Sequence, residues 1–537
     1  MSSPPLRGAV SAAGERWAVA TPDPRPAEAA AAAFEAGGNA VDAALHAATM
    51  LAIVNPHQCG AGGDLFALVQ NPDGKVVAID SSGRAPSGAD AGALRDTYGT
   101  TMPQDGPASV TVPGAVRGWE AVHAQGANLP WASAFERPID AATNGFAVSR
   151  DLAGALAEDE DRLRADPNTA AVFVPEGVPS QGDRLVWPAL AATLGAVASD
   201  GADVLYGGDL GARLAEGLRE AGVPITHGDL AGHTADLVPP LRGRYRDLDV
   251  LVSPPPSQGF VLLEALAAIE RLGIDPDPGG ADAGTLARIV QAANADRDRH
   301  LADPDAMTLH VSALLDDGHI AALCDSVREG LEGHTGDRRA QGTIRGATGG
   351  DTIALVTADA EGWAVALIQS LYGGFGSGIL EPSTGLLLHD RGGCFTLQPG
   401  HPNELASGKK PAHTLMPVVV QRDGRIVAVT GTRGGHGQPQ IDLMTLVRTF
   451  DLELPPERAL AAPRWLVGGM EPLVGDPWIA CEEDVPAVGQ DALRAAGFRI
   501  DPIPAGHRDA GFPMLIHTDA GFRAASDPRS DAGALAS

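Results

Sequence analysis

Thr352 stands where a hydroxyl side chain could act as a nucleophile. It follows the glycine-containing segment 349–351 and begins an aliphatic run, 353–356, whose composition predicts a strand. A hydroxyl is a weak nucleophile that needs a base close by. A threonine at the start of a strand is also common for its β-branched shape alone. Taken by itself, the segment leaves a catalytic role and a structural role of Thr352 open.

A second predicted strand and a glycine-rich loop follow Thr352. Residues 363–371 form another apolar run, and the loop 373–378 contains the letters Phe-Gly-Ser-Gly. This order resembles the self-cleaving junction of the γ-glutamyltransferase family of N-terminal nucleophile hydrolases. The resemblance implies that the chain is cut between Asp351 and Thr352. The new α-amino group, with an ordinary pKa of about 8, would then serve as the base for the hydroxyl of the same residue.

Five further segments match the same family in the same order. They are the helix start with its glycine turn (39–44 and 57–64), 112–114, 253–259, 295–299 and 303–305. Because the match forms one continuous stretch, we expect one interwoven structural domain. The family fold is a four-layer α-β-β-α sandwich, whereas periodicity alone predicts only an α/β protein. Cleavage would divide the chain into a large segment, 1–351, and a small segment, 352–537.

Local patterns predict several of the elements that this fold needs. Strands are expected at 17–21, 65–70, 353–357, 364–370, 417–421 and 426–431. Helices are expected from about residue 26 to Gly37, over 40–54 with Asn39 as the N-cap, and from about Pro439 to Thr449. The end of the chain, 524–537, is expected to be frayed.

Three further residues complete the catalytic group that the resemblance implies. Ser370 falls where a second hydroxyl contacts the nucleophile, although a solvent-facing serine at a strand end fits the local pattern equally well. Gly434 and Gly435 match the glycine pair whose N–H groups form the oxyanion hole. Such N–H groups stabilise the charge of a tetrahedral intermediate. A flexible turn is the alternative role for this pair.

The expected substrate-binding residues depart from those of the best-known family members. Those enzymes hold a glutamyl α-carboxylate with an arginine and two serines, and the α-ammonium with a carboxylate. Here Ser82 takes the place of the arginine, with Arg84 two residues later, and Cys394 replaces the carboxylate. His413 and Thr414 replace the serine pair. A buried ammonium without an opposing carboxylate loses its charge-assisted hydrogen bonds, so we expect weak binding of γ-glutamyl groups.

This altered pattern is similar to the branch of the family that contains oxamate amidohydrolase. Tyr372 stands where an asparagine is usual in the family. The candidates for binding a small carboxylate next to the scissile amide are Arg84, Arg391, Arg433, His413 and His436, each of which also fits a structural role. The resemblance therefore predicts a self-processing amidohydrolase whose substrate is a small carboxylate-bearing amide, with oxamate as the first candidate.

Three other functions stay open on the sequence alone. The chain could be a true γ-glutamyltransferase or glutathione hydrolase, with Arg84 in place of the missing arginine, or a cephalosporin-type acylase. An uncleaved, inactive binding protein is the third alternative. The threonine mechanism needs no cofactor or metal, and the chain has no H-E-x-x-H or C-x-x-C motif. The expected assembly is one large and one small fragment, or a dimer of such αβ pairs.

The charge of the chain limits its partners. Acidic residues outnumber basic ones by 68 to 39, which gives a formal charge of −29. Such a surface repels nucleic acid and anionic membranes. The longest apolar stretch, 40–54, is too short to cross a bilayer, and residues 1–25 lack the apolar core of a signal peptide. We therefore expect a cytoplasmic protein that acts on a small molecule.

Overall fold

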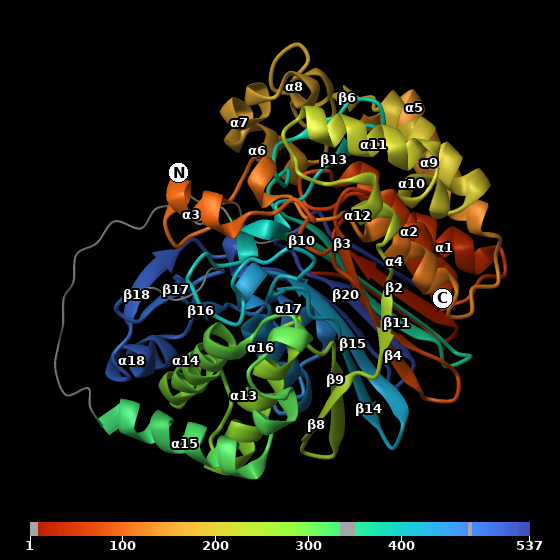
Figure 1. Ribbon diagram of the computed structural model, residues 1–537. Helices are drawn as coiled ribbons and strands as arrows, with labels where there is room; N and C mark the ends of the chain where they lie inside the picture. The colour runs from red at the N-terminus through yellow and green to blue at the C-terminus, as the bar shows by residue number, and fades with distance from the viewer. Residues whose placement is uncertain (1–8, 333–348, 471–474) are drawn as a thin grey trace.

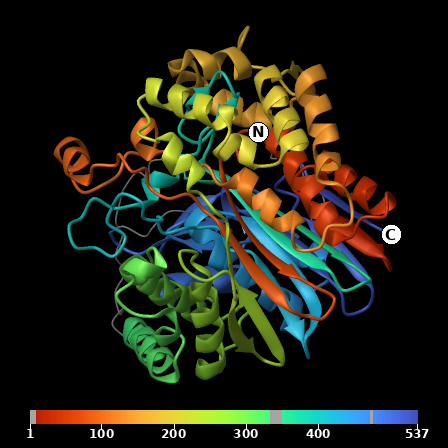
Figure 2. The same ribbon diagram turned by 45° about the vertical axis from the view of Figure 1, so that its right-hand side comes forward.

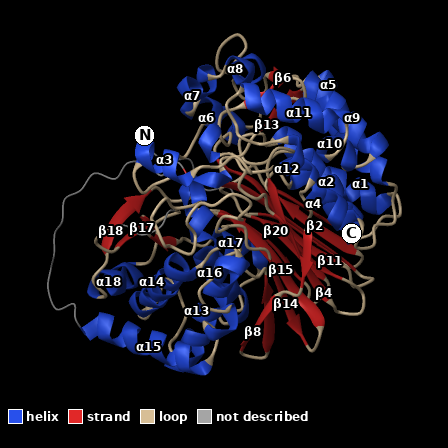
Figure 3. Cartoon of the chain, in the orientation of Figure 1, coloured by secondary structure: helices blue, strands red, loops and turns tan. Residues whose placement is uncertain are grey.

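Two seven-stranded antiparallel sheets lie face to face at the centre of the protein, as the computed structural model shows for residues 9–332, 349–470 and 475–537 (Figures 1 and 3). The first sheet has the order β1 (Val10–Gly14), β20 (Phe522–Ser526), β19 (Phe512–His517), β15 (Arg425–Arg433), β14 (Val418–Arg422), β9 (Leu248–Val252) and β8 (Leu241–Tyr245). The second has the order β21 (Gly533–Ala536), β2 (Trp17–Thr21), β10 (Gly349–Asp359), β11 (Ala364–Gly373), β3 (Asp64–Gln70), β4 (Val76–Ser81) and β7 (Asp236–Val238).

Helices cover the outer face of each sheet (Figure 2). Those that share an apolar cluster with the second sheet are α1 (Pro24–Glu35), α2 (Ala40–Val54), α4 (Ala115–His123), α5 (Glu136–Asn144), α6 (Arg150–Glu158), α7 (Glu160–Ala165), α8 (Pro167–Phe173), α9 (Pro188–Asp200), α10 (Asp203–Tyr206), α11 (Asp209–Glu220) and α12 (His227–Ala231). Those on the first sheet are α13 (Gly259–Leu272), α14 (Ala283–His300), α15 (Asp317–Glu332), α16 (Gln438–Phe450), α17 (Pro456–Ala461) and α18 (Ala487–Ala495).

Smaller elements lie at the ends of the sandwich. Helix α3 (Ala91–Tyr98) packs on a separate small apolar cluster with Phe395 and Leu397. The short sheets are β5 (Phe146–Ala147) with β6 (Arg184–Leu185), β12 (Leu380–Glu381) with β13 (Leu386–Leu387), and β16 (Trp465–Val467) with β17 (Trp478–Glu482) and β18 (Arg499–Ile503).

Strand alternation accounts for the four layers. Successive side chains of a strand point to opposite faces of its sheet. In β10, Ile353 and Leu355 pack against the helices, whereas Ala354 and Val356 pack between the two sheets. The layer between the sheets is separate from the two helix-covered cores. The predicted α-β-β-α sandwich is therefore confirmed.

The local sequence patterns predicted the central elements well. Helix α2 begins and ends as expected, because the Asn39 side chain accepts the N–H groups of Val41 and Asp42 while Asp42 accepts the Asn39 N–H. The predicted strands are all present, and β10 and β11 extend beyond their predicted ends.

The expectation of a frayed chain end was wrong. Residues 522–526 form β20, and β21 pairs with β2 along its length. The carbonyl oxygen of Ser537 also accepts the N–H groups of Glu15, Arg16 and Trp17. The small residues of this segment have little preference for a strand, so the local sequence did not predict one. Pairing with distant strands orders the segment instead.

Both sheets contain strands from before and after residue 352. In the second sheet, β10 lies between β2 and β11. The two predicted segments are thus interleaved in space, and their boundary stays a prediction. None of the helices in the described part of the chain combines the length and hydropathy that crossing a bilayer requires.

Removal of residues 533–537 should lower the melting temperature by several degrees. Strand β2 would lose its outer partner, and three N–H groups would lose the Ser537 carbonyl. Each such hydrogen bond contributes about 1 kcal/mol. Calorimetry of the purified chain measures the shift, and Ser537→Ala, which keeps the backbone carbonyl, should melt like the parent. An unchanged melting temperature in the shortened chain would show that β21 contributes no stability.

Candidate active site

Thr352 and Ser370 form a buried hydroxyl pair on neighbouring strands. Thr352 Oγ1 lies 2.9 Å from Ser370 Oγ. Ser370 Oγ also donates to the carbonyl oxygen of Asp351 at 2.8 Å and accepts the Tyr372 N–H at 2.7 Å. The structure thus brings together the predicted nucleophile, its hydroxyl partner and the carbonyl of the predicted scissile bond.

The direction of these hydrogen bonds follows from the single proton of each hydroxyl. A serine hydroxyl has one donor and two acceptor positions. Because Ser370 donates to the Asp351 carbonyl, it must accept from both Thr352 and the Tyr372 N–H. Ser370 can therefore take the proton of the attacking hydroxyl while giving its own proton to the carbonyl oxygen that becomes negative.

Irregular strand pairing places this pair. Asp351 pairs with Tyr372 and Ile353 pairs with Gln369, so Thr352 alone faces two residues of β11. Such a bulge re-aims the side chains beside it. Tyr372 has φ of 79°, a region that non-glycine residues rarely adopt. Both the strand that contains the predicted scissile bond and the strand opposite it thus depart from regular geometry.

The glycine pair lies in the turn between β15 and α16. Gly434 and Gly435 have φ of 149° and 51°, which favour glycine, and the short helix 435–437 packs against β10. The Gly434 carbonyl accepts the Gly437 N–H, and the Gly435 carbonyl accepts the Gln258 side chain. These contacts use carbonyl oxygens and occupy neither glycine N–H. Their role as oxyanion donors stays a prediction.

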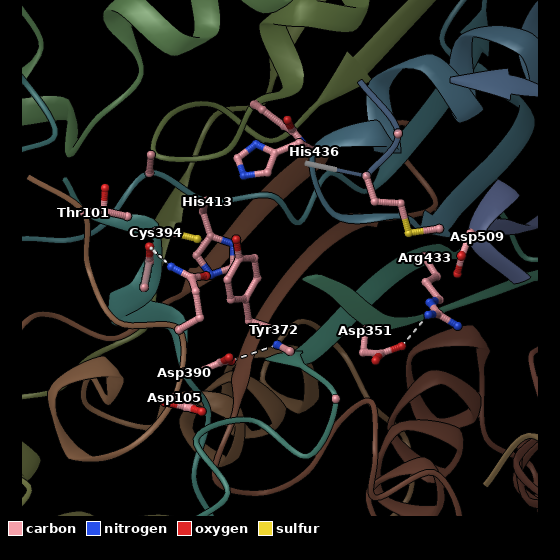
Figure 4. Close-up of a pocket in the computed structure, with 18 of the residues that line it drawn as sticks. Thr101, Asp105, Asp351, Tyr372, Asp390, Cys394, His413, Arg433, His436 and Asp509 are labelled. Carbon is pink, nitrogen blue, oxygen red and sulfur yellow. Dashed lines mark hydrogen bonds and ion pairs between the residues drawn. The ribbon is translucent and has the colours of Figure 1, made fainter. Parts of the chain in front are cut away.

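Two arginines hold the carboxylate of Asp351, and Figure 4 shows the ion pair that Arg433 makes with it. Arg433 Nη2 lies 2.5 Å and Arg508 Nη2 lies 3.3 Å from Asp351 Oδ1. Arg508 also lies 3.7 Å from Asp151 and 3.6 Å from Glu158. Burial alone would lower the pKa of Arg508, but these carboxylates raise it above its usual value. Arg508 therefore stays positively charged.

A cavity of about 1090 Å³ opens beside this carboxylate. Its wall includes six of the predicted site residues, namely Asp351, Tyr372, Cys394, His413, Arg433 and His436 (Figure 4). Thr352 and Ser370, in contrast, are 0% exposed. A substrate in the cavity cannot reach the nucleophile while the bond before Thr352 is intact, as expected of a precursor.

Asp64 organises the opposite wall from beneath. It is fully buried, and Oδ2 lies 3.0 Å from His413 Nε2, 3.1 Å from His389 Nδ1 and 3.2 Å from Arg391 Nε. Arg391 stacks on the Tyr372 ring, with its central carbon 4.4 Å from the ring centre. Arg391 also donates to Thr414 Oγ1 at 3.1 Å. This network orients Tyr372 and His413 toward the cavity.

Burial and neighbouring charges set the protonation of this wall. Although burial alone would raise it, the pKa of Asp64 is held well below its usual range by His389 and His413. Burial, followed by the charge of Arg391, lowers the pKa of His413 to about 4. Burial also lowers the pKa of His436 well below its usual range. Both cavity histidines are therefore neutral at neutral pH.

The residues that replace the glutamyl-binding groups have other partners. Cys394 Sγ lies 3.6 Å from Arg391 Nη1, and burial raises the pKa of its thiol. Ser82 Oγ donates to Asp80 at 2.6 Å. Arg84 is half exposed, pairs with Asp303 at 3.3 Å and is absent from the cavity wall in the described structure. The predicted binding role of Arg84 gains no support from this placement.

Comparisons with known proteins agree with this geometry. Residues 26–537 match the family described as Gamma-glutamyltranspeptidase. An oxamate amidohydrolase proenzyme of Klebsiella pneumoniae subsp. pneumoniae is 36% identical over 530 residues, covering 94% of this chain and 96% of the relative. The Glutathione hydrolase-like YwrD proenzyme of Bacillus subtilis is 33% identical over 465 residues, covering 85% and 86%. The crystal structure of cephalosporin acylase from Bacillus halodurans superposes with a TM-score of 0.89 at 30% identity, covering 100% and 98%.

The layered fold and the buried threonine define an N-terminal nucleophile hydrolase. The chain belongs to the γ-glutamyltranspeptidase family, as an amidohydrolase proenzyme that matures by autocatalytic cleavage. Membership of an enzyme family sets aside the alternative of an inactive binding protein.

Several contributors to the site were not expected from the sequence. Arg508 and Asp64 lie far from Thr352 in the chain and carry no motif of their own. Arg297 donates to the His436 carbonyl at 3.1 Å and supports the glycine turn. Only the position of Asp64 at the end of the glycine turn 57–64 was a signal for it.

Ser370→Ala should slow self-cleavage by about 100-fold or more. Thr352 would lose its proton acceptor and the Asp351 carbonyl would lose a donor, and one such donor is typically worth that factor. Denaturing gels of freshly purified precursor measure the rate. The matched control is Ser526→Ala, because Ser526 is also buried and donates to a backbone carbonyl, that of Thr21. Equal rates in Ser370→Ala and the parent would remove Ser370 from the reaction.

Proposed function

We propose that the precursor cuts itself between Asp351 and Thr352. Thr352 Oγ1 attacks the Asp351 carbonyl carbon, its proton passes to Ser370, and the Ser370 proton passes to the carbonyl oxygen. The carbonyl then re-forms and the peptide C–N bond breaks as this proton moves to the Thr352 nitrogen. The Asp351 acyl group is then an ester on Thr352. Water hydrolyses this ester, which leaves an Asp351 carboxylate and a free Thr352 α-amine. The hydroxyl chain from Thr352 through Ser370 to the carbonyl oxygen supports this sequence of steps.

The mature enzyme then repeats the same chemistry on an amide substrate. The Thr352 amine accepts the hydroxyl proton, and Oγ1 attacks the amide carbonyl. The N–H groups of Gly434 and Gly435 stabilise the negative oxygen. The amine or ammonia leaves with a proton, and water hydrolyses the acyl ester on Thr352. A cytoplasmic location and a pairing of two αβ units stay parts of this proposal.

The substrate that we propose is a small amide with a carboxylate near its carbonyl, such as oxamate. The observation that carries this choice is the grip of Arg433 and Arg508 on the Asp351 carboxylate. In the precursor, Asp351 supplies the acyl group, and its side chain places a carboxylate two carbons from the attacked carbonyl, as in succinamate. Oxamate, whose carboxylate is bonded directly to its amide carbonyl, has to reach the same arginines from closer to the nucleophile. When this end of the large segment moves away, both guanidinium groups face the cavity beside the nucleophile. The similarity to an oxamate amidohydrolase proenzyme supports the same choice.

A γ-glutamyl substrate fits this site poorly. Its α-ammonium would approach Cys394, and the nearest charge there is the guanidinium of Arg391, 3.6 Å from the thiol. An ammonium placed beside the thiol would lie close to this guanidinium and be repelled by it, although Asp64 offsets part of the Arg391 charge. Ser82, in the place of the carboxylate-binding arginine, has no charge and hydrogen bonds to Asp80.

An acylase that acts on larger side-chain amides is the second candidate. The cavity of about 1090 Å³ is much larger than oxamate and falls at the upper end of the range for drug-sized ligands. The high TM-score to a cephalosporin acylase agrees with this alternative.

Cleavage should yield a small fragment whose first residue is Thr352. Thr352→Ala should remain one inactive chain on a denaturing gel, because it has no nucleophile for either reaction. Thr357→Ala is the matched control: Thr357 is a buried threonine of the same strand that hydrogen bonds to the Ala40 carbonyl, and this variant should cleave normally. N-terminal sequencing identifies the cut, and any other first residue would contradict the proposed junction.

Arg433→Met should lower kcat/KM for carboxylate amides by about 10- to 100-fold, since a hydrogen bond to a charged group contributes about 1.5–3 kcal/mol. In the series oxamate, malonamate and succinamate, the carboxylate lies one carbon further from the amide carbonyl each time. Their relative rates show at which distance from the carbonyl the arginines bind the carboxylate. Acetamide, without a carboxylate, should be affected little, and the exposed control Arg494→Met should match the parent.

Rates are compared per cleaved enzyme, because Arg433 also contacts the scissile segment. Efficient turnover of γ-glutamyl-p-nitroanilide, with kcat/KM of about 10⁴ M⁻¹s⁻¹ or above, would overturn the substrate proposal while leaving the cleavage site intact. A preference for cephalosporin side-chain amides would select the acylase alternative.

A further inference from the structure

We propose that helices α13, α14 and α15 bind a divalent metal ion of the zinc type. The ligands are Glu264 on α13, Asp296 on α14 and His319 on α15. His319 Nε2 lies 3.0 Å from Asp296 Oδ2 and 3.3 Å from Glu264 Oε1. The three helices meet at this point on the outer face of the first sheet.

The donor spacing suits one small ion. Zinc binds imidazole nitrogen and carboxylate oxygen at about 2.0–2.2 Å, so neighbouring donors of one tetrahedral site lie about 3.3–3.6 Å apart. The His319 contact with Glu264, at 3.3 Å, matches this spacing, and the contact with Asp296, at 3.0 Å, is slightly shorter. One atom from each of the three residues lies within 4.8 Å of the others. A single ion between the three side chains therefore requires only small movements.

Glu264 provides independent evidence for a missing cation. Its side chain is 0% exposed, and neither carboxylate oxygen has a hydrogen-bond partner in the described structure. Oε1 has only the ion-pair contact with His319, and a buried carboxylate without compensating bonds is strongly unfavourable. An ion between Glu264 and His319 would satisfy this group.

The ligand chemistry favours zinc over harder or softer ions. Two carboxylates and one imidazole form a mixed oxygen and nitrogen set, without the thiolates that select softer ions. Magnesium and calcium prefer oxygen ligands alone. Three protein ligands leave a fourth tetrahedral position, which water would fill.

The site lies behind the glycine turn and takes no part in the threonine chemistry. Gln258, directly before α13, donates to the Gly435 carbonyl at 2.9 Å, and Arg297, directly after Asp296, donates to the His436 carbonyl at 3.1 Å. An ion that joins α13 to α14 would fix the position of Gln258 relative to Arg297. Its role is therefore to stabilise the frame of the oxyanion turn.

Zinc titration of the untagged, chelator-treated full-length chain tests the site. Calorimetry should show one tight site in the parent, and zinc should raise its melting temperature, because an ion that binds only the folded state stabilises it. His319→Ala and Glu264→Gln should each lower the affinity by at least about 10- to 100-fold, the loss caused by removing even an outer-shell partner, and should lose the thermal shift.

Two neighbouring variants are the controls. His310→Ala and Glu270→Gln remove exposed residues near the same helices and should bind zinc like the parent. Glu264→Gln keeps the shape of the side chain and removes only its charge. If His319→Ala fails to fold, the affinity of Glu264→Gln for zinc still decides the test. Absence of tight zinc binding in the parent, or equal affinities in the parent and Glu264→Gln, would show that a protonated His319 holds the two carboxylates without an ion.

Discussion

Antiparallel pairing of β10 with β11 sets the position of every reacting group in the precursor. It places Ser370 beside Thr352 and brings the same hydroxyl to the Asp351 carbonyl. The bulge opposite Thr352 makes this possible, because regular pairing would give Thr352 one opposite residue rather than two. Cutting a strand in the middle of a sheet would normally threaten the fold. Here the proposed cut falls near the start of β10, and the rest of that strand is paired with β2 and β11.

Arginines stand beside Asp351 although both the chain and the cavity are acidic. The chain carries a formal charge of −29, and the cavity wall holds eight carboxyl groups against the four arginines Arg162, Arg297, Arg433 and Arg508. At physiological ionic strength, repulsion between exposed charges fades over about 8 Å, so the acidic surface does not bar a small anion from the cavity. The buried carboxylate of Asp64 lies against Arg391 and offsets the positive charge of that guanidinium. Within this acidic lining, Arg433 and Arg508 are the cations that contact the Asp351 carboxylate.

The sequence predicted what motifs and local patterns encode. Thr352, Ser370 and the Gly434–Gly435 turn were found from an ordered family resemblance, and the strands around them from apolar alternation. Arg508 was missed because its role depends on a long-range contact with Asp351 that no local spacing reveals. The ordered end of the chain was missed for the same reason, since β21 is stabilised by β2 more than five hundred residues away. The binding role of Arg84 stays a prediction, because its side chain pairs with Asp303 and is absent from the cavity wall in the described structure.

The layer between the two sheets has a consequence for motion. Many of its side chains are alanines, among them Ala18, Ala20, Ala354, Ala358, Ala364, Ala366 and Ala524. Alanine has no rotamers to lose or to exchange, so these positions cannot take up a change in sheet spacing by side-chain rearrangement. At the alanine positions the two sheets can separate only if whole strands move together, which favours a rigid support beneath Thr352.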